Sequence, residues 1–305
     1  MDFLKQYDPP ADLKDPVMLF AFAGWADAAD SATHALRYLV EKAGAPKFAE
    51  VDPEEFYNFT RVRPHTNFDD EGNRYIEWPA NEFFLLRGGE SASDVVVFVG
   101  VEPNLKWRTF CSSLTAIAKE LGVVRVIHMG ALLDAVPHTR EPRLTGTATS
   151  PELRGLLSGI KVRRSRYTGP TGITGVLMDA LRRSGIPGVS LWGHAPHYLH
   201  VSPNPKVSLR LLHGIERLVN VSVDVEPLRS QGSKFDRRVE RALAEEPELK
   251  AYVERLEEQW DSRRDNAPRA GGGDDDMPEP EQAVRGIEEF LRQARQGGDA
   301  PEGQD

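Results

Sequence analysis

Apolar residues along this chain occur in short uninterrupted runs that alternate with longer amphipathic stretches. The runs at 17–25, 94–100 and 123–130 end in glycine or a turn, which is typical of buried strands. Within 32–40 and 105–121 the apolar positions recur at helical spacing, and a glycine stops the second stretch. This alternation of buried strands and helices predicts an α/β protein whose crossover helices cover a sheet.

Later segments continue the alternation of strands and helices, and one of them predicts a hairpin. A glycine-rich turn opens a helix within 169–185, a short strand follows at 189–192, and a helix covers 205–218. The segments 75–78 and 82–86 flank a Pro-Ala-Asn link, which predicts a hairpin rather than a crossover. An antiparallel hairpin beside parallel units predicts a mixed sheet.

Beyond Pro227 the pattern becomes purely helical, and Pro247 interrupts its apolar stripe, so we expect a pair of helices. The next segment is rich in Gly, Pro and charged residues, which is typical of a flexible linker. A short terminal helix with Ile287, Phe290 and Leu291 on one face follows it. The predicted organisation is an α/β domain over 1–226, a helical extension over 227–261, a linker over 262–282, and a terminal helix with a tail over 283–305.

Composition adds limits on partners and location. Lys and Arg number 38 against 47 Asp and Glu, a net charge of -9 that disfavours the basic face needed for nucleic acid. The single cysteine, Cys111, allows no intrachain disulfide and fits a reducing cytoplasm. No apolar run approaches the ~20 residues of a membrane span and no secretory signal is visible, so we expect a cytoplasmic protein without a membrane partner. The low mean hydropathy of -0.45 is largely explained by the polar tail.

The segments that follow the predicted strands carry the candidate chemistry, because ligands of open α/β sheets bind beyond the carboxyl ends of the strands. One hypothesis is a pocket for a small anion or a sugar, with Arg140 and the amides after Gly169 facing negative charge. Asp27 or Glu102 would act on a proton there. The candidate residues, as a ligand-binding or a structural cluster, are Asp27, Glu102, His138, Arg140, Thr171 and His197.

A structural interpretation of the same residues competes with the pocket. Gly, Pro and Thr shape tight turns, and Asp27 or Asp30 caps the helix that follows the first strand. The His and Arg side chains then satisfy buried carbonyls or form a subunit interface. We therefore assign none of these residues the role of acid, base or nucleophile from the sequence.

Several local motifs fall short of a cofactor site. His194, His197 and His200 are close in sequence, but Pro196 interrupts any helix and no nearby carboxylate completes a metal shell. The stretch GPTGITG lacks the lysine of a phosphate loop and the glycine spacing of a dinucleotide site. Cys111 falls within a predicted helix and is expected to be a small core residue. We expect no metal and no cofactor.

Six stretches, in order along the chain, carry a resemblance to a known family. They span about 16–225, and several motifs in register are more specific than any one alone. The stretches are FAGWADAADSATHAL (22–36), GNRYIEWP (72–79), VGVEPNLKWRTF (99–110), MGALLDAVPHTR (129–140), YTGPTGITGVL (167–177) and WGHAPHYLHVSPNPK (192–206). On these stretches the chain resembles the proteasome assembly chaperone 2 family, in its bacterial branch.

The resemblance implies a three-layer, phosphorylase/hydrolase-like α/β fold with helices on both faces of a mixed sheet, and self-association into a homo-oligomer such as a trimer. It implies no established enzymatic activity. Family members in eukaryotes and archaea act as chaperones for assembly of proteasome α-subunits, and some archaeal members dock through a terminal hydrophobic-Tyr-any tripeptide. This sequence ends in PEGQD, so docking on proteasome subunits by that route is not expected.

Two functions of different classes follow. The first is an oligomeric, protein-binding or chaperone-like role without established catalysis. The alternative is an enzyme that acts on a nucleoside or a small phosphorylated metabolite in a phosphorylase-like pocket, although fold analogy alone does not establish such a role. An open cavity around the candidate residues would favour the enzyme, and subunit contacts there would favour protein binding.

Overall fold

A nine-stranded sheet forms the centre of the computed structural model, which describes residues 3–7, 10–89, 92–160, 162–165, 167–199 and 201–265. From one edge to the other its strands are β1 (Leu4–Gln6), β3 (Lys47–Val51), β6 (Glu82–Leu86), β7 (Val95–Val101), β2 (Val17–Ala23), β8 (Arg125–Asp134), β11 (Gly188–Pro196), β9 (Leu144–Ala148) and β10 (Arg163–Arg164).

The directions of these strands make the sheet mixed. The central strands β7, β2, β8 and β11 are parallel to one another. On one side β6, β3 and β1 continue the sheet with antiparallel pairs, and on the other side β9 pairs antiparallel with β11. The mixed sheet predicted from the sequence is therefore confirmed.

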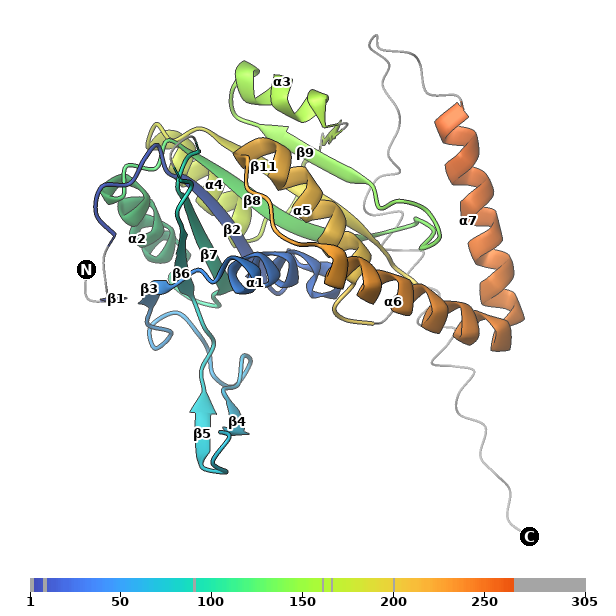
Figure 1. Cartoon of the computed structure of the whole chain (residues 1–305), viewed down its shortest axis with the longest axis horizontal. Coiled ribbons are helices and arrows are strands. Elements are labelled where there is room, and N and C mark those ends of the chain that lie inside the picture. Colours follow the sequence, from blue (N-terminus) through green and yellow to red (C-terminus); the bar gives the residue numbers. More distant parts are fainter. Residues whose placement is uncertain are drawn as a thin grey trace.

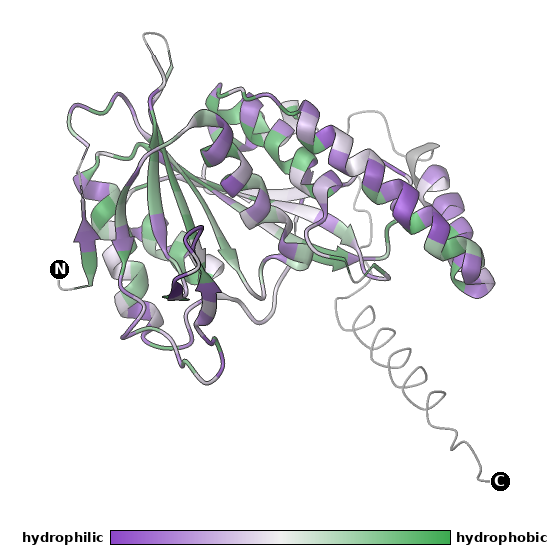
Figure 2. Ribbon diagram, turned by 60° about the horizontal axis from the view of Figure 1, so that its bottom comes forward, coloured by the Kyte–Doolittle hydropathy of each residue, from purple (hydrophilic) through white to green (hydrophobic). Residues whose placement is uncertain are grey.

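Helices cover both faces of the sheet, which gives three layers (Figure 1). One face carries α1 (Ser31–Ala43), α3 (Pro151–Gly159) and α5 (Pro205–Val219), and the other carries α2 (Trp107–Glu120) and α4 (Ile173–Arg183). In Figure 2 the central strands are mostly hydrophobic while the helices are hydrophobic on one side, as expected for strands buried on both faces.

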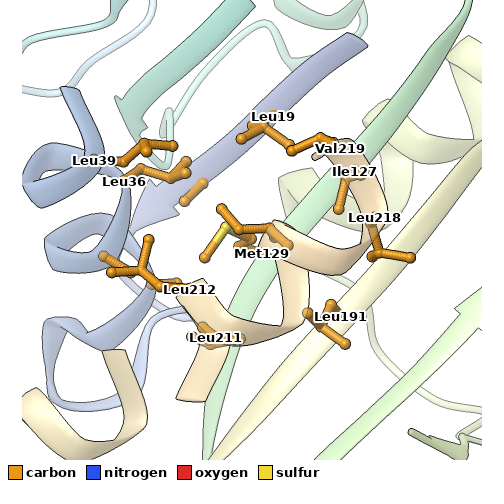
Figure 3. Packing of buried hydrophobic residues seen from close by; sticks show 14 of the residues in the cluster. Leu19, Leu36, Leu39, Ile127, Met129, Leu191, Leu211, Leu212, Leu218 and Val219 are labelled. Atoms are coloured by element: carbon orange, nitrogen blue, oxygen red, sulfur yellow. The ribbon is translucent and has the colours of Figure 1, made fainter. Parts of the chain in front are cut away.

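Strand β2 shows how one sequence supplies both cores. Successive side chains of a strand point to opposite faces. Val17 and Leu19 accordingly pack under α1 and α5, whereas Phe20 and Phe22 pack under α2 and α4. Figure 3 shows the first core, which is built largely from aliphatic side chains of the strands and of α1 and α5.

The hairpin expected from 75–78 and 82–86 is wrong. Strand β5 (Arg74–Glu77) pairs instead with β4 (His65–Phe68) in a separate two-stranded sheet, which projects from the body in Figure 1. Strand β6 lies in the main sheet between β3 and β7, where Phe83 and Leu85 are buried. Burial of these alternating apolar side chains favours the main sheet, while every residue of β5 is exposed.

Two further helices, α6 (Glu226–Glu245) and α7 (Pro247–Asp265), form the predicted helical pair and meet at Pro247. They share a small core of their own, made of Phe235, Val239, Leu243 and Val253. Helix α7 continues past the predicted boundary at 261. The remainder of the predicted linker, 266–282, and the predicted terminal helix, 283–305, lie outside the described residues. Among the described helices, none has the length and apolar character to cross a membrane.

Candidate functional site

Asp27, four residues after the end of β2, is a buried helix cap. Its carboxylate accepts hydrogen bonds from the backbone N–H groups of Ala32 (2.6 Å) and Thr33 (3.1 Å) and from the Thr33 hydroxyl, at the start of α1. Burial raises the pKa of Asp27 to about 6, against the lowering effect of these hydrogen bonds. Of the two alternative caps, Asp27 has the capping contacts, and Asp30 makes no side-chain cap bond to α1.

Glu102, directly after β7, holds the start of α4. Its Oε1 accepts the backbone N–H of Ile173 at 2.9 Å. Gly172 permits this approach, because a Cβ at that position would lie 2.7 Å from Glu102 Oε1 and 3.0 Å from the ring of Trp25. Thr171 is exposed beside this contact and its hydroxyl bonds only locally, to the Gly172 carbonyl at 3.4 Å. The helix start that could receive an anion is thus filled by a carboxylate of the chain.

His138 and His197 lie at the carboxyl ends of β8 and β11, under the α6–α7 pair. The Tyr198 hydroxyl accepts the backbone N–H of His138 at 2.8 Å and lies 2.7 Å from His138 Nδ1, to which it donates. The His197 ring joins two elements, since Nδ1 donates to the Asp134 carbonyl (3.0 Å) and Nε2 accepts from the Tyr252 hydroxyl of α7 (3.3 Å). Burial, together with the charge of Lys206, lowers the pKa of His138. Both rings therefore bind structural partners.

Arg140 is an anchor for α7. Its Nε and Nη2 donate to the two carboxylate oxygens of Asp261 at 3.1 and 2.7 Å, a bidentate pair. Its Nη1 lies 3.5 Å from Glu257 Oε1, one turn earlier on α7. The neighbouring Arg143 stacks on the Trp260 ring at 4.6 Å. The arginine that was a candidate for an external anion thus already binds carboxylates.

A polar line that the sequence analysis did not identify runs beneath these residues. The Thr145 hydroxyl lies 2.9 Å from His194 Nε2, and His194 Nδ1 lies 2.7 Å from Asp134 Oδ2. Burial opposes ionisation of Asp134, but its hydrogen bond with His194 and the charge of Arg143 outweigh burial and lower its pKa. Sequence order hides this line because β9 reaches β11 only through antiparallel pairing across the sheet.

The cavity at this end of the sheet is small. Its volume is about 10 Å³, room for about one water molecule. Among the six candidate residues, His138 and Arg140 line it, whereas Asp27, Glu102 and Thr171 belong to the starts of α1 and α4 described above. Phe235 of α6 and Trp260 of α7 close it. The structure thus places three candidates at two helix starts and two at a helix-covered cavity, while His197 contacts Tyr252 of α7 outside that lining.

His128, in the middle of β8, is another buried polar residue that sequence reasoning passed over. Its Nδ1 lies 2.9 Å from the Ser190 hydroxyl, and its ring contacts Phe20 and Trp192. Burial lowers its pKa to about 3, so the ring is neutral. A histidine between the apolar residues Ile127 and Met129 of a predicted buried strand was the signal that could have identified it.

The ribbon formed by β4 and β5 carries a different kind of candidate surface. Cross-strand pairing places Phe68 and Ile76 on one face, while Tyr75 lies on the other. These side chains are 68%, 49% and 47% exposed, respectively. Trp78 follows the ribbon and stacks edge-on against Phe59 at 4.9 Å. Large apolar side chains that gather on an exposed ribbon are typical of an interaction surface.

The layers and the covered strand ends define a three-layer α/β protein whose terminal helices pack over the sheet. Among the described residues no group of three or more His, Cys, Asp or Glu side chains is arranged to hold a metal ion. The chain belongs to the PAC2 family, whose sequence profile matches residues 21–243. The family membership expected from the sequence is confirmed.

Solved structures agree with this assignment. A PAC2 family protein from Streptomyces avermitilis is 39% identical, with a TM-score of 0.71, and the match covers 78% of this chain and 100% of that one. A Mycobacterium tuberculosis proteasome-assembly chaperone homologue is 38% identical, with a TM-score of 0.69 and coverage of 78% and 99%. Pyrococcus furiosus PbaB, an archaeal proteasome activator, shares the fold at 18% identity, with a TM-score of 0.64 and coverage of 79% and 99%. None of the curated proteins compared with the chain matches it.

Proposed function

We propose that this protein is a cytoplasmic homo-oligomer with a protein-binding, chaperone-like role. The observation that carries the proposal is the ribbon of β4 and β5, which exposes Phe68, Tyr75 and Ile76 away from the body. A two-stranded ribbon is only marginally stable in water by itself. Contact with another protein surface would stabilise the ribbon, and a second copy of the chain is a partner that is always present.

Two other observations support a protein-binding role. The structural relatives include proteins named for proteasome assembly or activation, which act on other proteins. At the strand ends, the candidate residues bind helices of the same chain, and the cavity there has a volume of about 10 Å³. That volume is far below the ~300 Å³ at which small-molecule pockets begin.

The test is the mass of the protein in solution. Sedimentation velocity at micromolar concentration should show an oligomer for the natural chain and a lower mass for the double variant Phe68→Ser with Ile76→Ser, which removes the apolar side chains from one face of the ribbon. Leu156→Ser is the matched control, because Leu156 on α3 is also exposed, at 42%, but lies outside the ribbon. A monomeric natural chain, or equal masses for the natural chain and the ribbon variant, would contradict the proposal.

A second candidate function, an enzyme acting on a nucleoside or a phosphorylated metabolite, is favoured by one observation. The line Thr145–His194–Asp134 has the spacing of a hydroxyl, a base and an orienting carboxylate, at 2.9 and 2.7 Å. Trp260→Ala would enlarge the cavity beside His194. A thermal-shift screen of both chains with phosphate, nucleosides and nucleotides tests it, since ligand at ~100 times its dissociation constant adds ~2.7 kcal/mol. No shift in either chain would exclude this candidate.

A further inference from the structure

One groove on the described part of the chain is separate from the strand-end cavity. It has a volume of about 600 Å³ and lies between the loop that precedes α5 and one side of α6. That volume is within the range of ligand-binding clefts. The loop contributes Val201, Ser202, Pro203 and Pro205, and α6 contributes Gln231, Lys234, Arg237, Arg238 and Arg241.

Four cations dominate the helix side of this groove. Lys234 and Arg241 each lie three or four residues from both members of the adjacent pair Arg237 and Arg238, which puts the four on neighbouring turns of one side of the helix. All four are exposed, and within the described residues none forms a salt bridge. Like charges at such spacing repel one another, so an unneutralised row of this kind is costly to the helix. Figure 2 shows hydrophilic colour along much of α6.

Other charges near the groove offset this row only in part, since Glu240 lies three residues from Arg237 on α6. Asp236 of α6 is engaged by Lys206, at 2.9 Å, and Glu226 is engaged by Arg229, at 3.1 Å. Asp30 reaches the loop side through the Ser202 hydroxyl. A groove with four clustered cations is unusual in a chain whose net charge is -9, and it fits an anionic occupant.

We propose that the occupant is the acidic segment DDDMPEPE, 274–281, of the same chain. This segment holds five carboxylates within eight residues, at Asp274, Asp275, Asp276, Glu279 and Glu281. Its charge complements the row on α6. Met277, between the acidic residues, supplies an apolar side chain for the loop wall that Val201 and Pro203 form.

The length of chain available permits this contact. Helix α7 has 19 residues and is therefore about 28 Å long. Residues 266–273 separate Asp265 from Asp274, and nine extended steps span about 30 Å. The acidic segment can thus return along the length of α7 to the carboxyl half of α6, where Arg237, Arg238 and Arg241 lie.

Covalent attachment favours this occupant over a free anion. A short linker gives an effective concentration of about 1 mM, so even a contact with a dissociation constant of about 0.1 mM would be formed most of the time. The attraction between exposed charges is screened over about 10 Å at 0.1 M salt and about 3 Å at 1 M salt. The contact is therefore an electrostatic latch that salt opens, and it is independent of the ribbon and of the proposed oligomer.

Energy transfer between two dyes on the full chain tests the latch. Cys111 is buried and is replaced by Cys111→Ala, and dyes are attached through Ser233→Cys on α6 and Gln282→Cys after the acidic segment. An excess of unlabelled chain keeps one labelled copy in each oligomer. Transfer efficiency is expected to fall about two-fold or more between about 0.05 M and 1 M salt.

Charge reversal supplies the decisive comparison. Asp274→Lys with Asp275→Lys and Asp276→Lys should reduce transfer at low salt to its high-salt value. Adding Lys234→Glu with Arg238→Glu to that variant should restore transfer, because the charges are exchanged and not removed. The matched control is Asp299→Lys with Glu302→Lys and Asp305→Lys, which reverses three acidic residues outside the segment and should leave transfer unchanged.

Three results would overturn the latch. They are transfer that does not respond to salt, equal loss in the segment variant and the control variant, and transfer that occurs only between separately labelled chains. The last result would assign the groove to the acidic segment of a neighbouring copy. The mass of the oligomer is expected to be the same in all these variants, so failure of the latch is distinguishable from failure of the proposed self-association.

Discussion

At the scale of single residues, two carboxylates occupy positions where the fold offers positive charge. Helix N-termini present free N–H groups and the positive end of the helix dipole. Asp27 takes this position at α1 and Glu102 takes it at α4, each with backbone contacts of 3.1 Å or less. Both residues lie in the loop that follows a parallel strand, so the chain itself supplies the anions for its own helix starts.

The raised pKa of Asp27 predicts a specific pH dependence of stability. Between its ordinary value of 3.8 and about 6, the folded protein holds a proton that the unfolded chain has released. This contribution to stability is present at low pH and is lost as pH rises through 6. From pH 7 to pH 5, the natural chain should gain about 1 kcal/mol of unfolding free energy relative to Asp27→Asn.

Urea unfolding of both chains at pH 5, 6 and 7 measures this difference. Asp27→Asn keeps an oxygen that can accept from the Ala32 amide, so the comparison removes the titration and keeps one capping contact. A difference in unfolding free energy that stays constant across this pH range would contradict the assignment of the pKa.

At the scale of elements, α7 is held by side chains that reach it from the strand ends. Arg140 binds Asp261, His197 meets Tyr252, and Arg143 stacks on Trp260. These contacts lie at two places on α7, one at Tyr252 and the other eight or nine residues later at Trp260 and Asp261. A helix with this many polar contacts and few apolar ones opens more readily than the sheet beneath it.

Arg140→Ala should loosen α7 without unfolding the body. The ion pair is partly exposed, and such pairs contribute up to about 1 kcal/mol, so exchange of α7 amide hydrogens should accelerate about two- to five-fold. Hydrogen exchange followed by mass spectrometry measures the change. Arg182→Ala is the control, because Arg182 also pairs with an aspartate, Asp179 on its own helix α4, without touching α7. Equal exchange of α7 in the natural chain and the Arg140 variant would contradict the anchoring role.

The sequence predicted the elements that have strong periodic patterns and missed those that depend on pairing. Strands β2, β7 and β8 are apolar enough to be identified alone, and so are α1 and α2, which follow β2 and β7. Strand β9 reads LTGTA, which has little apolar character, and becomes a strand because β11 offers it an edge. Strand β5 was paired with β6 in the prediction because local spacing favoured a hairpin, whereas burial of Phe83 places β6 in the main sheet and β5 pairs with β4.

At the scale of the whole molecule, three hydrophobic clusters stabilise unequal parts. The two faces of the sheet have cores of their own, and the α6–α7 pair has a third, much smaller one around Phe235. Cooperative units with less buried apolar surface open at lower free energy. The α6–α7 pair is thus expected to separate from the body before the sheet unfolds.

Two substitutions of the same type distinguish these units. Phe235→Ala and Phe98→Ala each delete a buried ring, and such changes cost about 3–5 kcal/mol. The first should accelerate amide exchange in α6 and α7 by more than about ten-fold while β2, β7 and β8 keep their protection. The second should accelerate exchange in the sheet as well. Equal acceleration everywhere by both variants would show that the molecule opens as one unit.

The sequence predicted which residues of the strand ends belong to the candidate site, but it did not predict which residues they contact. The rule that strand ends carry chemistry selected His138, Arg140 and His197, which the structure places near one another under the terminal helices. Their partners, Asp261 and Tyr252, lie more than 50 positions away in sequence on α7. Which residues of α7 lie over the sheet depends on the angle at which the helix packs against the body. No local pattern in a single sequence predicts that angle.

The carboxylate of Glu102 at the start of α4 bears on how new activities arise. Shortening that one side chain would leave the amide of Ile173 free beside Gly172, with the aromatic ring of Trp25 at the same place. A free amide at a helix start can bind a phosphate group, and an exposed aromatic ring beside it can stack on a nucleotide base. In such a fold, one substitution can therefore change a helix start that is capped by the chain's own carboxylate into one that is free to bind a ligand. The strands, helices and cores stay intact.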